Sequence, residues 1–163
     1  MHPDFMFLVT HAAIGALVGE LFPNHPYLAF VLGFCSHLLT DIIPHGDTKI
    51  YKGYIAGSKV KRAIAYVMLD GVITVFFILT LFNTHVYDHR FAVSMGVAGG
   101  VLPDLLVAMY EIFHVKALKW FHKFHFFFHN MISGKHDLPF PVGFAMQLLL
   151  LVPLLGRLLR GAF

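Results

Sequence analysis

The chain has 163 residues, of which 58% are apolar and 13% are charged. Soluble domains average about 45–50% apolar and about 25% charged residues, so the composition excludes an ordinary water-soluble globule. A mean hydropathy of +0.72 indicates that much of the surface faces a lipid bilayer. At this length we expect a single integral membrane domain over residues 1–163.

Histidine is unusually frequent, with 12 residues against 12 lysines and arginines and nine carboxylates. The net charge of +3 is spread along the chain, so we expect no nucleic-acid partner and favour anionic lipid or substrate head groups. The single cysteine, Cys35, excludes an internal disulfide and a cysteine-rich zinc site. We expect no cleavable signal peptide, because the first apolar stretch lacks a basic flank and contains His11.

Five apolar runs approach the roughly 20 residues that a helix needs to cross a bilayer. The segment 114–139, rich in aromatic and basic residues, suits an amphipathic helix lying in the membrane interface. The predicted fold is therefore an all-α integral membrane bundle of about five transmembrane helices with one interfacial helix. The five runs cover residues 5–22, 27–43, 63–82, 91–113 and 140–159.

The lysines and arginines predict how this bundle is oriented, because cytoplasmic loops hold the excess of positive charge. With five spans, the N-terminus, the 44–62 loop and the 114–139 segment share one side and hold nine of the twelve basic residues. Arg90, Arg157 and Arg160 lie on the other side. We therefore expect a prokaryotic-type inner membrane protein with its N-terminus in the cytoplasm.

Two pairs of glycines have the four-residue spacing that lets helix backbones approach closely in lipid. They are Gly15 with Gly19 in the first run and Gly96 with Gly100 in the fourth. We interpret both pairs as packing positions without a direct functional role.

An ionisable side chain inside a span raises the free energy of membrane insertion by roughly 2.5–3.5 kcal/mol. Each one is therefore expected to have a polar partner or a functional role. Counted along the predicted spans, His11, Asp41, Asp70 and Asp104 lie within roughly 14 Å of the cytoplasmic surface, and the histidines of residues 122–129 lie at the same interface. Glu20 lies near the opposite surface. Scattered packing histidines have no reason to converge at one depth. In chain order the candidates are His11, His37, Asp41, His45, Asp47, Asp70, Asp104, His122, His125 and His129.

Imidazole and carboxylate ligands without thiolate suit a divalent metal: zinc first, with manganese or iron also accepted, as one or two ions. The spacing of His37 and Asp41 places both on one helical face. We expect Asp41, Asp104 and His125 to take part in catalysis. The expected metal ligands are His11, His37, Asp41, His45, Asp104 and one or two of His122, His125 and His129.

Several of these residues have simpler interpretations. A lone intramembrane histidine such as His11 is usually a packing residue that donates a hydrogen bond. Asp104 after Pro103 could cap a broken helix, and the histidine stripe of residues 122–129 could be the polar face of an interfacial helix. Asp70 is equally consistent with a partner for a neighbouring helix and with a ligand or a group that orients one.

Three segments also carry a resemblance to a known family: HAAIGA from His11, GFCSHLLTDIIPH from Gly33 and GVLPD from Gly100. They resemble the membrane-bound metal-dependent hydrolases of the YdjM-like group, which is distantly related to zinc-dependent phospholipases C. The resemblance covers about two thirds of the chain. It implies that His11, His37, Asp41 and Asp104 are metal-site residues. Many members carry a His-Arg and a Thr-His-Ser segment where this chain has the stripe of residues 122–129.

The predicted function is metal-dependent hydrolysis, at the cytoplasmic face, of an ester or phosphoester in a lipid or another membrane-accessible substrate. Two alternatives remain at this point. A transporter or channel for divalent cations or protons also uses intramembrane histidines and aspartates. A non-catalytic membrane protein could use the metal only to staple its helices.

Overall fold

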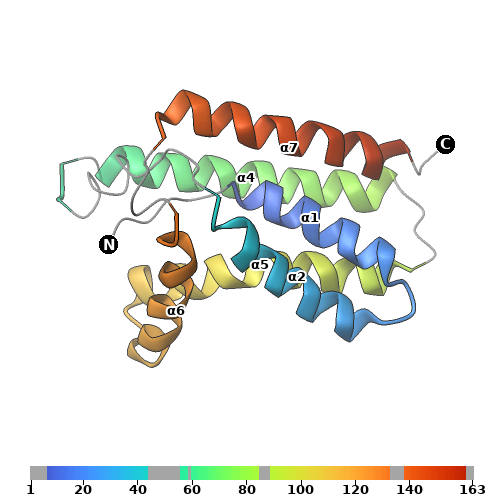
Figure 1. Ribbon diagram of the computed structural model, residues 1–163, viewed down its shortest axis with the longest axis horizontal. Coiled ribbons are helices and arrows are strands. Elements are labelled where there is room, and N and C mark those ends of the chain that lie inside the picture. The colour runs from blue at the N-terminus through green and yellow to red at the C-terminus, as the bar shows by residue number, and fades with distance from the viewer. Residues whose placement is uncertain (1–6, 44–55, 59, 85–88, 133–137, 161–163) are drawn as a thin grey trace.

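The computed structural model describes residues 7–43, 56–58, 60–84, 89–132 and 138–160, and this part of the chain contains helices and turns but no strand (Figure 1). Each of the five predicted apolar runs forms a helix, and the predicted interfacial segment contains another, so the all-α prediction is confirmed. The helices are α1 (Leu8–Leu21), α2 (Pro26–Thr40), α4 (Val60–Thr84), α5 (Arg90–Phe113), the short 3-10 helix η1 (Lys116–Leu118), α6 (Lys119–His129) and α7 (Phe140–Arg160).

Three of these helices are long and apolar enough to cross a membrane, fewer than the five predicted. They are Ile64–Asn83 within α4, Arg90–Phe113, and Pro141–Leu158 within α7. Helices α1 and α2 are apolar but have only 14 and 15 residues. At 1.5 Å per residue they reach about 21–23 Å, short of the roughly 30 Å of a hydrocarbon core. The three candidate spans indicate that the chain associates with a membrane.

The long helices run side by side along the long axis of the molecule, and successive ones point in opposite directions (Figure 1). The turn between α1 and α2 lies at one end. Helix α6 lies at the other end and crosses the direction of the rest (Figure 1). The beginning of α1, the end of α2 and α6 are thereby brought to the same end of the bundle.

Helices α1, α2 and α5 form a closely packed core of three helices that depends on glycine. A Cβ atom on Gly96 would overlap the backbone of Gly15, and a Cβ atom on Gly33 would overlap the carbonyl group of Gly96. The three backbones therefore touch, which only glycine permits. Cβ atoms on Gly19 and Gly100 would meet backbone too, so the predicted packing role of both glycine pairs is confirmed.

Helices α4 and α7 pack more loosely, against α1 and against each other. Their inward side chains, including Phe77, Leu81 and Leu151, join one apolar cluster with α1. Their outward side chains are also apolar, and Phe76 is 70% and Leu149 74% exposed. A helix that is apolar on all sides suits a lipid environment.

The beginning of α1 is held by side chains of both of these helices. The cap residue Phe7 offers no side-chain hydrogen bond of its own. Instead its backbone N–H donates to Gln147 Oε1 of α7 at 2.6 Å, and the N–H of Leu8 donates to Asp70 Oδ2 of α4 at 2.7 Å. These bonds satisfy donors that a buried helix terminus would leave unpaired. Asp70 is thus the partner of a neighbouring helix, which was one of its two interpretations.

The chain reverses after α5 and returns as α6, so that α5, η1 and α6 form a hairpin. Helix α5 ends where His114 adopts a left-handed backbone conformation with φ of 54°. Helix α6 is amphipathic, as predicted. Phe121 and Phe126 are buried against α5 and its neighbours, whereas Trp120 and Phe127 are exposed on the other side. The buried side also carries two histidines.

Candidate metal centre

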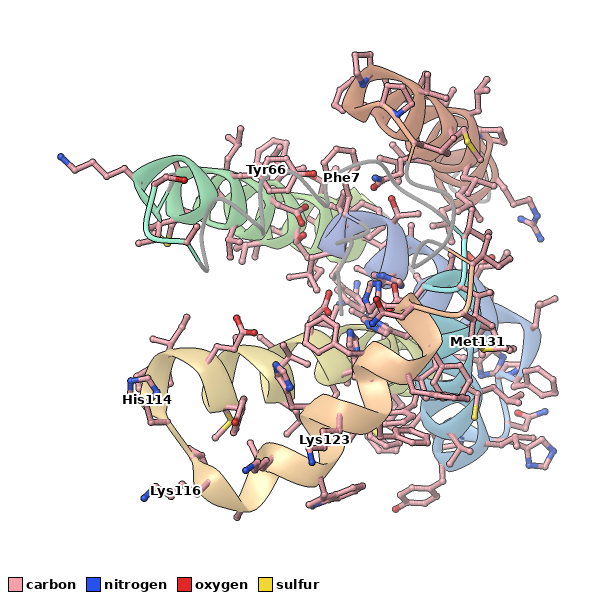
Figure 2. The ribbon with its side chains drawn as sticks, turned by 60° about the vertical axis from the view of Figure 1, so that its left-hand side comes forward. Phe7, Tyr66, His114, Lys116, Lys123 and Met131 are labelled. Carbon is pink, nitrogen blue, oxygen red and sulfur yellow. The ribbon has the colours of Figure 1, made fainter. Side chains whose placement is uncertain are left out.

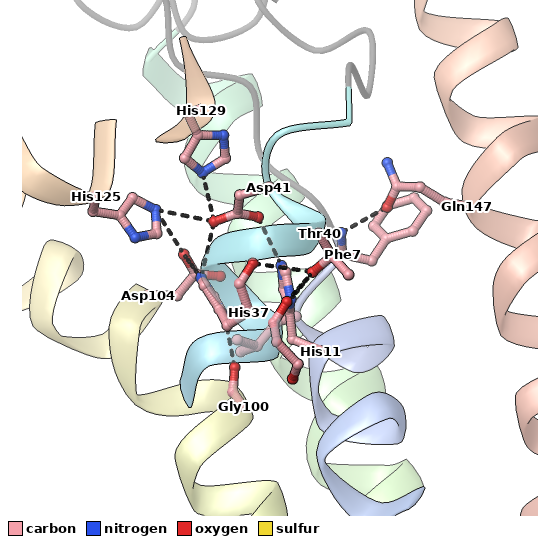
Figure 3. Close-up of polar contacts among 12 residues, drawn as sticks. Phe7, His11, His37, Thr40, Asp41, Gly100, Asp104, His125, His129 and Gln147 are labelled. Atoms are coloured by element: carbon pink, nitrogen blue, oxygen red, sulfur yellow. Dashed lines mark hydrogen bonds and ion pairs between the residues drawn. The ribbon is translucent and has the colours of Figure 1, made fainter. Parts of the chain in front are cut away.

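Six predicted site residues from four helices or their ends meet at one point near the α6 end of the bundle (Figure 3). Each reaches the point because its helix is fixed there: α1 by its two caps, α2 and α5 by the glycine contacts, and α6 by its apolar side. The six are His11, His37, Asp41, Asp104, His125 and His129, which we call the His/Asp centre.

Asp41, immediately after α2, is the middle of the centre (Figure 3). His11 Nε2 lies 3.0 Å from Asp41 Oδ1. Three other Nε2 atoms surround the second oxygen, Oδ2: those of His37 at 3.1 Å, His125 at 3.4 Å and His129 at 3.0 Å. One carboxylate is therefore in contact with four imidazole rings.

Asp104 completes the centre from α5. Its Oδ1 atom lies 3.5 Å from His37 Nε2 and 3.6 Å from His125 Nε2. Helix α5 continues through Pro103, so Asp104 lies inside a helix and does not cap the beginning of one. The Asp104 side chain is 18% exposed, whereas that of Asp41 is 1% exposed.

Hydrogen bonds on the far side of two rings fix which nitrogen carries the proton. His37 Nδ1 lies 2.6 Å from the carbonyl oxygen of Gly100, which can only accept, so Nδ1 of His37 is the donor. The hydroxyl group of Thr40 donates to backbone carbonyls of α2. Its oxygen therefore accepts from His11 Nδ1 at 3.3 Å. When these rings are neutral, each turns the lone pair of Nε2 toward the carboxylate.

With His11 and His37 neutral, this arrangement is repulsive without a cation. Among the described residues, the Nε2 atoms of His11, His37 and His125 and both oxygens of Asp41 are buried without a hydrogen-bond partner. A cation between the nitrogens and the carboxylates removes the repulsion.

The His/Asp centre could therefore hold a metal ion. Two sets of three ligand atoms lie within 4.8 Å of one another. One set comes from His11, His37 and Asp104, and the other from His37, Asp41 and His125. The two sets share His37. The bonds from Nδ1 to Gly100 and Thr40 are of the kind that orient histidine ligands in metal sites.

The ring of His125 is in the form that binds a metal. Burial above all, and then the neighbouring His129, lower the pKa of His125 to about 3. The ring is neutral at neutral pH, so its nitrogen lone pair is available.

His122 does not join the centre. Its Nε2 atom lies 3.0 Å from Glu111 Oε1, in a pair that is partly exposed on the hairpin. Of the predicted stripe of three histidines, His125 and His129 therefore face the centre. His45 and Asp47 lie outside the described residues. His25, His89 and His114 are exposed and lie at helix ends away from the centre.

The groups that orient the ligands were not predicted from the sequence. Thr40 has a signal that could have revealed it, because it lies three residues after His37 and next to Asp41. The carbonyl of Gly100 has a weaker one: Pro103 lacks an N–H and interrupts the helical hydrogen bonds nearby. The partners at the start of α1, Asp70 and Gln147, depend on contacts between distant helices.

The fold and the centre together define a helical, membrane-associated protein with a buried cluster of histidines and aspartates. Comparison of the chain with protein-family models, with curated proteins and with solved structures gives no match.

Proposed function

We propose that the protein is a membrane-bound, metal-dependent hydrolase that cleaves an ester or phosphoester at the cytoplasmic face of the membrane. The observation that supports this most directly is the contact of one buried carboxylate, Asp41, with four imidazole nitrogens at 3.0–3.4 Å. Donors without thiolate are typical of hydrolytic zinc centres and also suit manganese or iron. The resemblance to the YdjM-like hydrolases agrees with this proposal, and membership of that family is part of it.

The number of donors favours two ions. Tetrahedral zinc takes four ligands, and the His/Asp centre offers six side chains. Asp41 presents one oxygen to His11 and the other to three histidines, so it would help to hold metal on both sides of the centre.

The side chains divide the chemistry between them. A divalent cation lowers the pKa of a water that it binds and polarises the ester oxygen. Asp104, the most exposed carboxylate of the centre, is placed to accept a proton from the attacking water. As the water oxygen bonds to the acyl carbon or phosphorus, the bond to the leaving oxygen breaks. The leaving oxygen then takes up the proton held by Asp104.

The proposal includes five membrane passes with the N-terminus inside. On this topology α1 and α2 cross the membrane as a short hairpin, and the α6 end of the bundle faces the cytoplasm. Labelling tests it through Asn24, which is exposed in the turn between α1 and α2. In a Cys35→Ser background, Asn24→Cys should react with an impermeant maleimide from outside intact cells. Reaction only after the cells are opened would show that α1 and α2 do not cross the membrane.

A metal that only staples the helices is the second candidate, because most of the ligands are buried as in closed structural zinc sites. The exposed edge at Asp104 favours the hydrolase. The two are separated by Asp104→Asn, in which a metal held by His37, Asp41 and His125 should stay bound while turnover of a soluble chromogenic phosphate ester falls about 10²–10⁴-fold. The matched control is Glu111→Gln, whose carboxylate pairs with His122 outside the centre and whose turnover should be unchanged. Metal-loaded wild type without turnover of any ester would support the staple.

A further inference from the structure

The His/Asp centre reaches the molecular surface at Asp104. The Asp104 side chain is 18% exposed, whereas the side chains of His37, Asp41 and His125 are at most 1% exposed. Among the described ligands, Asp104 has the most exposed side chain. We therefore expect a substrate of the proposed hydrolase to approach the centre past Asp104. The surroundings of that carboxylate therefore decide which substrates can arrive.

On one side of Asp104 the surface of α5 is apolar, whereas Glu111 lies two turns further along the helix. Val101 and Ala108, three residues before and four after Asp104, are its neighbours on the helix surface and are half-buried. Beyond them Leu105 is 49% and Ile112 60% exposed. All of these residues lie within the candidate membrane span Arg90–Phe113. A water-soluble ester would have to cross this apolar surface.

Among the described residues, helix α4 packs against α1 and α7, and it lies apart from the α5–η1–α6 hairpin in Figure 2. Beyond Lys61, its first half exposes several apolar side chains, among them Ile64, Val67 and Met68. Acyl chains therefore contact the surfaces of both helices more favourably than water does.

The hairpin adds positive charge beside this apolar surface. Lys116, Lys119 and Lys123 are exposed on η1 and α6, and Figure 2 shows Lys116 and Lys123 on the hairpin. Three ammonium groups at the end of an apolar helix complement an anionic head group at the membrane surface. The apolar approach and the basic end together match an amphiphile with an anionic head.

We propose that the substrate is a membrane lipid with a phosphate-ester head group, which reaches the His/Asp centre sideways from the bilayer, past Asp104. The inference rests on the proposed function and names the substrate class of the same centre. The lysines attract the head group at the membrane surface, the lipid then passes the apolar surface around Ala108, and its phosphate would be held at the His/Asp centre. The hydrolysis is the step given above, with water as the second reactant.

The test compares two phosphate esters that differ only in their apolar chain. Cobalt(II) replaces the native metal in the full-length protein in detergent, and its visible absorption reports anions that bind at the centre. Dodecyl phosphate should perturb this absorption at about one tenth, or less, of the concentration that ethyl phosphate requires, because only its long chain gains from the apolar surface. Equal concentrations for the two esters would overturn the inference.

Variants of α5 separate a specific path from simple partition into micelles. Ala108→Trp narrows the approach beside Asp104. The concentration of dodecyl phosphate that perturbs the cobalt absorption should therefore rise about ten-fold, and by less in Ala108→Leu. Ala145→Trp adds the same side chain at an exposed position of α7, which packs against α1 and α4, and should change nothing. Cobalt absorption without anion shows that each variant still folds around its metal. An unchanged response in both Ala108 variants would overturn the sideways path. A wild type that binds no cobalt would instead reject the metal centre itself.

Discussion

The α1–α2–α5 core and the α4–α7 pair are both built from apolar helices, yet they pack in different ways. In the core, glycines bring three backbones into contact. In the pair, large side chains separate the helices and many of them face outward. The core and its cap α6 supply every ligand of the His/Asp centre, whereas the pair supplies two caps at the start of α1. Close backbone packing therefore accompanies the His/Asp centre, and loose packing accompanies apolar side chains that face outward.

The largest effect should come from a methyl group in the core. Gly96→Ala places a Cβ against the carbonyl group of Gly15, so α1 and α5 have to separate. We expect a loss of about 3 kcal/mol in the free energy of unfolding, at the upper end for overpacked cores. The matched control is Gly71→Ala in α4, where a Cβ meets nothing within 4 Å. Thermal unfolding in detergent measures both, and equal midpoints would contradict the contrast between the two regions.

A pair of histidines on α6 tests which ones belong to the centre. His125→Ala should weaken zinc binding more than about 100-fold, because even residues that only orient ligands contribute 10–100-fold. His122→Ala should leave zinc affinity within about two-fold, since its partly exposed pair with Glu111 contributes little. Titration with a zinc-competing chelator measures both affinities. Similar losses of zinc affinity in the two variants would contradict the assignment of His125, but not His122, to the centre.

A threonine that orients a ligand should have a smaller effect. Thr40→Val removes the oxygen that accepts from His11 Nδ1, so the ring can rotate away from Asp41. We expect zinc affinity to fall about ten-fold. Thr74→Val is the control, because the Thr74 hydroxyl donates only within α4, to the carbonyl of Asp70. An unchanged affinity in Thr40→Val would exclude Thr40 as an orienting group.

The smallest effect should come from the α4–α7 pair. Asp70→Ala removes the acceptor for the N–H of Leu8 and should destabilise the fold by about 1 kcal/mol, as for other lost helix caps. Asp70→Asn keeps a carbonyl oxygen there and should recover most of that loss. Zinc affinity should change by no more than about three-fold in either variant. Loss of stoichiometric zinc in Asp70→Asn would place Asp70 among the ligands.

The sequence predicted the helices and most of the centre because both depend on local patterns. Apolar runs give the helices, and the four-residue spacing of His37 and Asp41 puts both on one face of α2. The convergence of His11, Asp104 and His125 followed from one assumption, that costly groups in a membrane share a depth. A shared depth does not say which residues of a helix face the centre, because that depends on how the helix is rotated about its axis.

The failures have the same physical origin. His122 and His125 are one turn apart on α6 and look equivalent in the sequence, but only His125 points toward Asp41. The lengths of α1 and α2 were overestimated because apolar residues continue past the helix ends. The role of Asp70 as an acceptor for the N–H of Leu8 depends on the contact between α1 and α4. The spacing of residues within one helix does not predict contacts between distant segments.

The most direct test of the central claim is the metal content of the purified protein, located by anomalous diffraction at the absorption edge of the metal. We predict at least one divalent ion per chain, with its anomalous peak among the Nε2 atoms of His11, His37 and His125 and the carboxylate of Asp41. Asp41→Ala should lose that peak. A wild-type crystal that shows this same cluster after growth with zinc, but no anomalous peak within it, would contradict the account.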